Sequence, residues 1–263
     1  VAPCGREEFR EQRRPERRVE RLPHADERPR QHERGAAVRE GRQRRRDAPD
    51  HDAGGDEPRS LLTVRYALDG EFFAWTDPEG ANRRLWLLNR LDSATSGVIL
   101  AAADHALATE IRVQFKRKQV RKIYYALVFG APRQPMEIWR DLLAVDKRGG
   151  KIRAATSAGH VPAESRMSVV RTGRQEPKVS LIRLEPRTGR SHQLRVQCAK
   201  RHLPIIGDQT YGDFGRNRTF AKLAGTKRMF LHSLETNFDY EWRERTWQFA
   251  ARAPIPREFE KFL

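Results

Sequence analysis

The chain has 263 residues, of which 52 are Lys or Arg and 35 are Asp or Glu, so its formal net charge is +17. A membrane-spanning protein is excluded because no apolar run approaches the roughly 20 residues of a spanning helix, and the first residues do not follow the pattern of a secretory signal peptide. The two cysteines, Cys4 and Cys198, are too far apart in sequence to predict a disulfide framework or a zinc cluster. We therefore expect a cytoplasmic protein with a polyanionic partner, most simply a nucleic acid.

Residues 1–60 form a low-complexity segment rich in arginine and glutamate. They hold 16 arginines, 14 acidic residues and no lysine, and only 12 of the 60 residues are apolar. We expect this segment to be disordered or loosely helical, since so few apolar side chains cannot offset the entropy of ordering the chain. Alternatively, residues 1–60 are an artefact of a shifted reading frame or of a misplaced start site. An arginine-rich RNA-binding arm is disfavoured, because the acidic residues reduce the net charge here to +2 and leave +15 on residues 61–263.

Residues 61–263 are predicted to form one α+β domain, with a mixed and mostly antiparallel central sheet and flanking helices. Short segments of alternating hydrophobicity, separated by turn signals, are typical of such a sheet. The predicted strands are Leu61–Leu68, Leu85–Asn89, Gly97–Ala102, Lys122–Phe129, Ser165–Arg171, Lys178–Glu185, Met229–Phe238 and Thr246–Ala251.

Three helices are predicted within this domain. Asp104 can cap a first helix, in which Leu107, Ile111 and Phe115 share one face. A second helix follows residues 188–190 and carries Leu194 and Cys198 four positions apart, and a short third helix starts near Pro256.

Three segments of the domain could carry chemistry. The loop Asn89–Gly97 joins two apolar strands and carries Asp92, which could be either a reactive group at a sheet end or an ordinary turn former. The segment Thr188–Arg195 follows a strand and opens a helix, so Arg190, His192 and Arg195 lie near a positive helix end that would stabilise a phosphate or a carboxylate. The alternative is a helix cap with solvated arginines and a structural histidine. In the strand Lys122–Phe129, Tyr124 lies on the opposite face from Tyr125. One tyrosine can therefore face a site while the other packs in the core, or both can be ordinary sheet-packing aromatics.

These segments resemble the RluA-type family of RNA pseudouridine synthases. The Asn-Arg-Leu-Asp-x-x-Thr-Ser-Gly loop, the Lys-x-Tyr-x-Ala-x-Val-x-Gly strand and the Thr-Gly-Arg-x-His-Gln-Leu-Arg turn occur in the family's order and spacing. A fourth motif, residues 204–212 with Asp208, Tyr211 and Gly212, follows in register. The resemblance covers about residues 84–251 and implies the pseudouridine synthase fold for the domain.

The resemblance also implies roles for six residues. Asp92 would be the catalytic aspartate, Tyr124 would lie against the extruded base, and Arg195 would pair with the Asp92 carboxylate. Arg90 would help to push the target uridine out of its stack, and Arg190 and His192 match motif positions at which we expect RNA contact.

The implied reaction isomerises uridine to pseudouridine and needs no cofactor or metal. The N1 glycosidic bond breaks, the uracil turns, and C5 joins the same sugar carbon. RNA is the implied partner, with ribosomal RNA as the family's common substrate and tRNA as the next, and we expect a monomer. Asp92 could act on the sugar, on the base, or by abstracting a sugar proton, and we favour proton abstraction. An inactive RNA-binding or ribosome-assembly factor of the same fold is the alternative, whereas a nuclease is disfavoured because no carboxylate cluster for magnesium is evident.

The chain departs from the family pattern at two places. It lacks the Lys-Pro-x-Gly turn that family members carry upstream of the aspartate loop, and Asn89 stands where histidine is commoner. We therefore expect the amino-terminal part of the fold to be atypical or incomplete.

Overall fold

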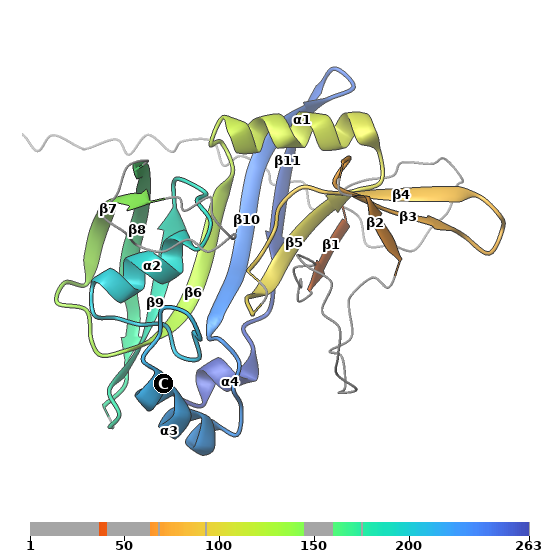
Figure 1. Cartoon of the computed structure of the whole chain (residues 1–263). Helices are drawn as coiled ribbons and strands as arrows, with labels where there is room; N and C mark the ends of the chain where they lie inside the picture. Colours follow the sequence, from red (N-terminus) through yellow and green to blue (C-terminus); the bar gives the residue numbers. More distant parts are fainter. Residues whose placement is uncertain are drawn as a thin grey trace, which may run out of the picture. The chain divides into compact units, whose positions relative to one another are not determined.

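The computed structural model describes residues 37–40, 64–67, 69–92, 94–144, 160–174 and 176–262. All of them belong to one compact unit, residues 34–263. Its framework is an eleven-stranded sheet (Figure 1). The strands are β1 (Ala37–Glu40), β2 (Arg65–Ala67), β3 (Phe72–Thr76), β4 (Asn82–Leu87), β5 (Ser96–Ala102), β6 (Arg121–Phe129), β7 (Met136–Ala144), β8 (His160–Thr172), β9 (Val179–Pro186), β10 (Leu231–Trp242) and β11 (Arg245–Arg252).

The strand order along the sheet is β2-β3-β4-β5-β10-β6-β9-β8-β7, while β1 pairs with β5 and β11 pairs with β10. Among the described strands, the parallel pairing is that of β5 with β10, which places Ser96 opposite His232 and Gly97 opposite Ser233. The other pairings are antiparallel. The predicted mixed and mostly antiparallel sheet is thus confirmed.

Gly97 allows β5 and β10 to approach each other at this central pairing. Its φ is +113°, and a Cβ atom at this position would lie 2.1 Å from the carbonyl oxygen of Ser233. A side chain here would therefore both strain the backbone and push the two strands apart.

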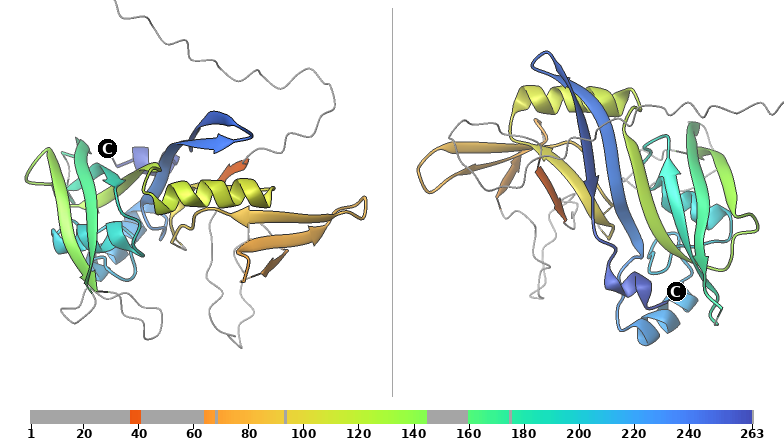
Figure 2. Two further views of the ribbon diagram at one scale, coloured as in Figure 1. Left: turned by 90° about the horizontal axis from the view of Figure 1, so that it is seen from above. Right: turned by 180° about the vertical axis from the view of Figure 1, so that it is seen from behind.

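Four helices flank the described part of the sheet: α1 (His105–Lys116), α2 (Gln193–Lys200), α3 (Phe214–Ala224) and α4 (Arg257–Glu260). The Asp104 side chain accepts from Leu107 N and caps α1 as predicted. Helix α1 lies across β5 and β10, and α3 and α4 lie together at one end of the sheet (Figures 1 and 2). The structure contains no helix, within the residues it describes, that is long and apolar enough to cross a membrane.

Separate apolar clusters hold the helices to the sheet. Trp86, Leu107, Ile111 and Phe238 belong to the cluster beneath α1. The cluster beneath α2 includes Ala126, Val128, Leu184, Leu194 and Cys198, whereas Leu127, Phe129, Phe220, Phe230 and Phe259 belong to the cluster that joins β6 to α3 and α4. The alternate residues of β6 thus serve two different clusters, as their period-two spacing predicts.

Eight predicted strands correspond to β2, β4, β5, β6, β8, β9, β10 and β11, with ends that differ by a few residues. Strands β3 and β7 and helix α3 were not predicted. In β7 apolar residues occupy both faces, with Met136 and Leu142 exposed and Trp139 buried, so the sequence shows no clear alternation. Helix α3 buries one large apolar side chain, Phe220, and its amphipathic signal is correspondingly weak.

The amino-terminal segment contributes one described element. Residues 37–40, which fall within the segment expected to be disordered, form β1 and pair with β5 from Ala37 opposite Ala101 to Glu40 opposite Val98. That expectation is therefore wrong for these four residues, whose backbone groups pair with those of residues 98–101 of β5. The rest of residues 1–60 lies outside the described residues.

Candidate active site

Asp92 lies on the loop between β4 and β5. The Thr95 backbone amide donates to the Asp92 carbonyl oxygen at 2.8 Å. Asn89 fastens the start of this loop to β5, because its Oδ1 accepts from Leu100 N at 2.7 Å. The Asp92 side chain is 27% exposed, so the carboxylate is held in place and still reachable from solvent.

The carboxylate of Asp92 pairs with Arg195, 103 positions away in the sequence. Arg195 Nη1 donates to Asp92 Oδ2 at 3.2 Å, and the guanidinium is largely buried. The structure thus brings together the two residues that the resemblance predicts to pair.

Arg195 has a second and tighter carboxylate partner, Asp208. Arg195 Nε donates to Asp208 Oδ2 and Nη2 donates to Oδ1, both at 2.7 Å, in a bidentate pair. Asp208 is 1% exposed, and its Oδ1 also accepts from the backbone amides of Thr210 and Tyr211. The bidentate contact fixes the plane of the guanidinium and leaves Nη1 directed at Asp92.

The pKa values of the buried pair reflect this contact. Burial alone would raise the pKa of the Asp208 carboxyl, but the hydrogen bonds and charge of Arg195 and the two backbone amides hold it below its usual value. Burial likewise opposes the charge of Arg195, whose pKa is nevertheless raised by Asp208 and, to a smaller extent, by Asp92. Both groups are therefore charged at neutral pH.

Hydrogen bonds to β8 orient helix α2, which carries Arg195. The side-chain Nε2 of Gln193 donates to Glu164 O and Ser165 Oγ, and its Oε1 accepts from Thr188 Oγ1 at 2.7 Å. Gln197, one turn later, accepts from Ser165 Oγ at 2.7 Å. Since Gln193 and Gln197 share one helix face, they hold that face to β8 and turn Arg195 toward the Asp92 loop.

His192 and Tyr211 form the adjoining side of the site. His192 precedes α2 in a left-handed conformation, with φ +55°. Its Nδ1 lies 3.0 Å from the Tyr211 hydroxyl, and its Nε2 lies 3.8 Å from Asp92 Oδ1. The Tyr211 ring also lies beneath the Arg195 guanidinium, with 5.1 Å between the guanidinium carbon and the ring centre. His192 therefore has one nitrogen on Tyr211 and the other facing the Asp92 carboxylate.

Tyr124 of β6 lies between two apolar clusters, one beneath α2 and one around Leu91 and Ile99. Burial raises the pKa of its phenol, the Asp92 charge raises it further, and Ser233 acts in the opposite direction. The phenol is therefore neutral at physiological pH and lies close enough to Asp92 to sense its charge.

Arg90 and Arg190 lie outside the network of Asp92, Arg195 and Asp208. Both side chains are exposed. Arg190 Nε donates to Pro162 O at 3.3 Å. Arg90 lies near Tyr66 of β2. Burial raises the pKa of the Tyr66 phenol, and the charge of Arg90 acts to lower it. Their exposure leaves both guanidinium groups accessible to a ligand that approaches Asp92.

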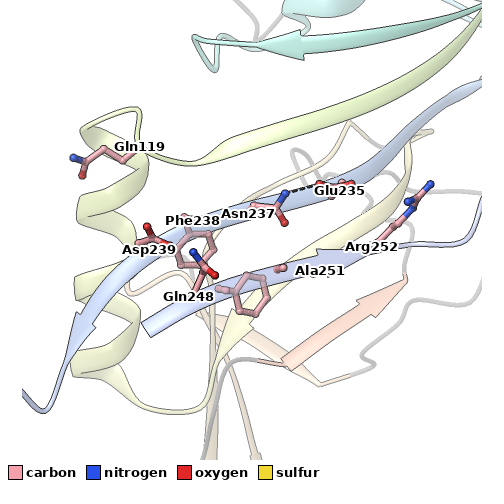
Figure 3. Close-up of a pocket in the computed structure, with 10 residues that line it drawn as sticks. Gln119, Glu235, Asn237, Phe238, Asp239, Gln248, Ala251 and Arg252 are labelled. Carbon is pink, nitrogen blue, oxygen red and sulfur yellow. Dashed lines mark hydrogen bonds between the residues drawn. The ribbon is translucent and has the colours of Figure 1, made fainter. Parts of the chain in front are cut away.

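A cavity of about 520 Å³ lies elsewhere, between the end of α1 and the β10–β11 hairpin (Figure 3). Gln119, Asn237, Asp239, Gln248 and Arg252 line it together with Phe238 and its neighbours, and its lining includes none of the six predicted site residues. In the described ranges, no group of three or more His, Cys, Asp and Glu side chains converges as metal ligands would.

Sequence reasoning assigned no roles to Asp208 and Tyr211. The signal was present, because both belong to the fourth motif of the resemblance, at residues 204–212. What that signal could not show is that Asp208, rather than Asp92, makes the bidentate contact with Arg195. The arrangement presents a carboxylate beside a fixed guanidinium and a neutral phenol, which suits chemistry by an ionised carboxylate in a partly enclosed site.

Comparison with known proteins points to one family. A sequence model described as RNA pseudouridylate synthase matches residues 67–200. The chain is 32% identical to the tRNA pseudouridine synthase C of Yersinia pestis, over 70% of this chain and 76% of that protein. It is 30% identical to the ribosomal large subunit pseudouridine synthase C of Vibrio vulnificus, over 69% of this chain and 55% of that protein. The structure of human RNA Pseudouridylate Synthase Domain Containing 1 is similar, with a TM-score of 0.54 and 26% identity over 65% of this chain and 69% of that chain.

Proposed function

Since this chain belongs to the RNA pseudouridylate synthase family, whose members isomerise uridine to pseudouridine in RNA, we propose that it modifies specific uridines of a structured ribosomal RNA or tRNA through Asp92. Relatives named for tRNA and for ribosomal RNA are about equally similar to it, so both substrates belong to the proposal. The observation that carries the role of Asp92 is its pairing with Arg195 at 3.2 Å, in a site where Asp208 fixes the guanidinium.

The proposed chemistry begins with access to the base. The target uridine must leave its stack, at a cost of a few kcal/mol. The exposed Arg90 can occupy the space that the base leaves, and the Tyr124 ring can stack against the extruded uracil. These contacts would offset part of the cost of extrusion.

Asp92 then acts as an ionised carboxylate. We favour abstraction of a sugar proton by Asp92, after which the C1′–N1 bond breaks, the uracil turns, and C5 bonds to C1′. The sugar proton is returned to the sugar, and the proton released from C5 is replaced by a proton taken up on N1, so the reaction is a net isomerisation. Arg195 keeps the carboxylate paired when it is ionised and remains in place because Asp208 holds it.

A modification assay tests this proposal. Purified chain is incubated with unmodified transcripts of large-subunit ribosomal RNA and of tRNA, and pseudouridine is read as carbodiimide-dependent primer-extension stops. We expect product with the wild type and none with Asp92→Asn, while RNA affinity is retained. Wild-type chain that binds RNA and never forms pseudouridine would instead support the inactive RNA-binding factor.

We propose further that the enzyme acts as a cytoplasmic monomer. Burial raises the pKa of the free Cys198 thiol, which leaves this cysteine poorly suited to disulfide exchange. Light scattering of the purified chain measures its mass directly, and a dimer mass would contradict the monomer. Fractionation of cells that express a tagged chain tests the compartment.

A further inference from the structure

Helix α3 presents a line of exposed side chains that the fold does not use. Phe214, Arg218 and Lys222 recur every four residues and therefore lie along one side of the helix. Phe214 is 58% exposed although it is a large apolar side chain, while Phe220 packs into the core on another side. With 11 residues, the helix is about 16 Å long.

The charge on and after α3 is of one sign. Between Phe214 and Leu234 the sequence has five Lys or Arg residues and no Asp or Glu. Two of the five have structural contacts, since Arg228 pairs with Glu258 at 3.6 Å and Arg216 lies over the Phe129 ring. The other three, Arg218, Lys222 and Lys227, are exposed and form no ion pair with any residue that the structure describes.

This surface is joined firmly to the candidate active site. Helix α3 begins directly after the loop that carries Asp208 and Tyr211. The Asn217 side chain accepts from Gly207 N at 2.8 Å and donates to Asp208 O at 3.0 Å, so the first turns of α3 are bonded to the residue that holds Arg195. A ligand on α3 would therefore have a fixed position relative to Asp92.

We propose that the α3 face, defined as Phe214, Arg218, Lys222 and Lys227, binds the RNA strand next to the target uridine. The three cations would contact backbone phosphates, and an unpaired base would stack on Phe214. RNA is the occupant that fits, because the face is cationic, carries an exposed aromatic ring and adjoins the site of an RNA-modifying family. The inference rests on the proposed function only in taking the bound strand to be the one that is modified.

The test compares two triple variants of the full chain. Arg218→Gln, Lys222→Gln and Lys227→Gln neutralise the α3 face. Lys116→Gln, Lys118→Gln and Arg245→Gln remove the same numbers of exposed lysines and arginines near α1 and the β10–β11 hairpin. This second region lies at the other end of β10, a strand of 12 residues that spans about 40 Å. The probe is a labelled RNA stem–loop with uridines in the loop, titrated at several salt concentrations.

We expect the α3 variant to bind the probe at least about tenfold more weakly at low salt, and the slope of log affinity against log salt to fall by about two. The control triple should change affinity by less than about twofold. Phe214→Ala should weaken binding about fivefold or more and Phe214→Trp should not, because tryptophan keeps the stacking surface.

The proposal would be overturned if the α3 variant kept the wild-type salt slope, or if the control triple lost as much RNA affinity as the α3 variant. Equal binding by Phe214→Ala and the wild type would overturn the stacking contact. These binding measurements do not depend on turnover. A wild-type chain that forms no pseudouridine would refute the proposed function, while the RNA affinities of the variants would still decide whether the α3 face binds RNA. Loss of self-association in the α3 variant, with RNA affinity unchanged, would assign the face to a second copy of the chain and overturn the proposal.

Discussion

Replacement of Asp208 by asparagine tests whether this residue positions the catalytic machinery. Asp208→Asn removes one negative charge and keeps the shape of the side chain. The oxygen that accepts from the Thr210 and Tyr211 amides can be retained. The amide nitrogen would then face an Arg195 donor across the 2.7 Å that now separates Nε from Oδ2. One of the two parallel hydrogen bonds is therefore lost and replaced by a repulsive contact.

The size of the effect follows from the burial of the pair. Removal of one partner from a buried ion pair costs about 3–5 kcal/mol, and the retained backbone hydrogen bonds reduce this to about 2–4 kcal/mol of unfolding free energy. Arg195 would also be free to rotate toward Asp92, its remaining carboxylate partner. A displacement of about 1 Å at a reacting group lowers kcat by about 100-fold, and we expect a loss of that order.

A buried carboxylate elsewhere in the molecule supplies the control. Asp141 of β7 accepts from Lys200 Nζ at 2.8 Å and from Arg201 Nη1 and Gln197 Nε2 at 2.9 Å, and its side chain is 7% exposed. None of its partners contacts Asp92, and the bond from Ser165 Oγ to Gln197 Oε1, which helps to orient α2, does not involve Asp141. Asp141→Asn should therefore lower stability by a similar amount and leave the turnover of folded molecules near that of the wild type.

Urea denaturation measures the stability of both variants, and single-turnover pseudouridine formation at saturating RNA measures the catalytic rate. The reasoning predicts that the two variants are alike in stability and differ in rate. If Asp208→Asn loses stability but retains a rate within about threefold of Asp141→Asn, then Asp208 serves the fold alone and the positioning argument is wrong.

Three further predictions concern the sheet and the base-binding side of the site. Gly97→Ala should cost about 3 kcal/mol or more in urea denaturation, because the new methyl group would meet the Ser233 carbonyl at a positive φ, and a cost near zero would contradict the close approach. Tyr124→Phe should leave RNA affinity within about twofold of the wild type, since the stacking ring is kept, whereas Tyr124→Ala should weaken it in the same titration. His232 has a pKa lowered from 6.5 to about 4 by burial and by the charge of Arg228. The unfolded chain therefore takes up the proton first, and thermal unfolding should show stability falling by up to about 3 kcal/mol as the pH drops from 6.5 to 4, a fall that His232→Gln should largely abolish.

The elements that the sequence predicted are those whose local pattern is strong. The alternation in residues 122–129 predicted β6, and the Asp104 cap with Leu107 and Ile111 predicted α1. Helix α3 and strand β7 were missed because their burial is set by neighbours that are distant in sequence. The exposed Phe214 and Leu223 of α3 and the exposed Met136 of β7 conceal the buried face in each case.

The sequence by itself determined which residues are available for chemistry and where the positive charge lies. The motif around Asp92, the helix with Arg195 and the excess of +15 on residues 61–263 are all readable from it. Only the tertiary structure decided how one guanidinium is divided between two carboxylates, with two bonds of 2.7 Å to Asp208 and one of 3.2 Å to Asp92. Burial and hydrogen-bond direction determine that division. Both depend on how the loops after β4 and α2 meet across the sheet, which local sequence patterns do not specify.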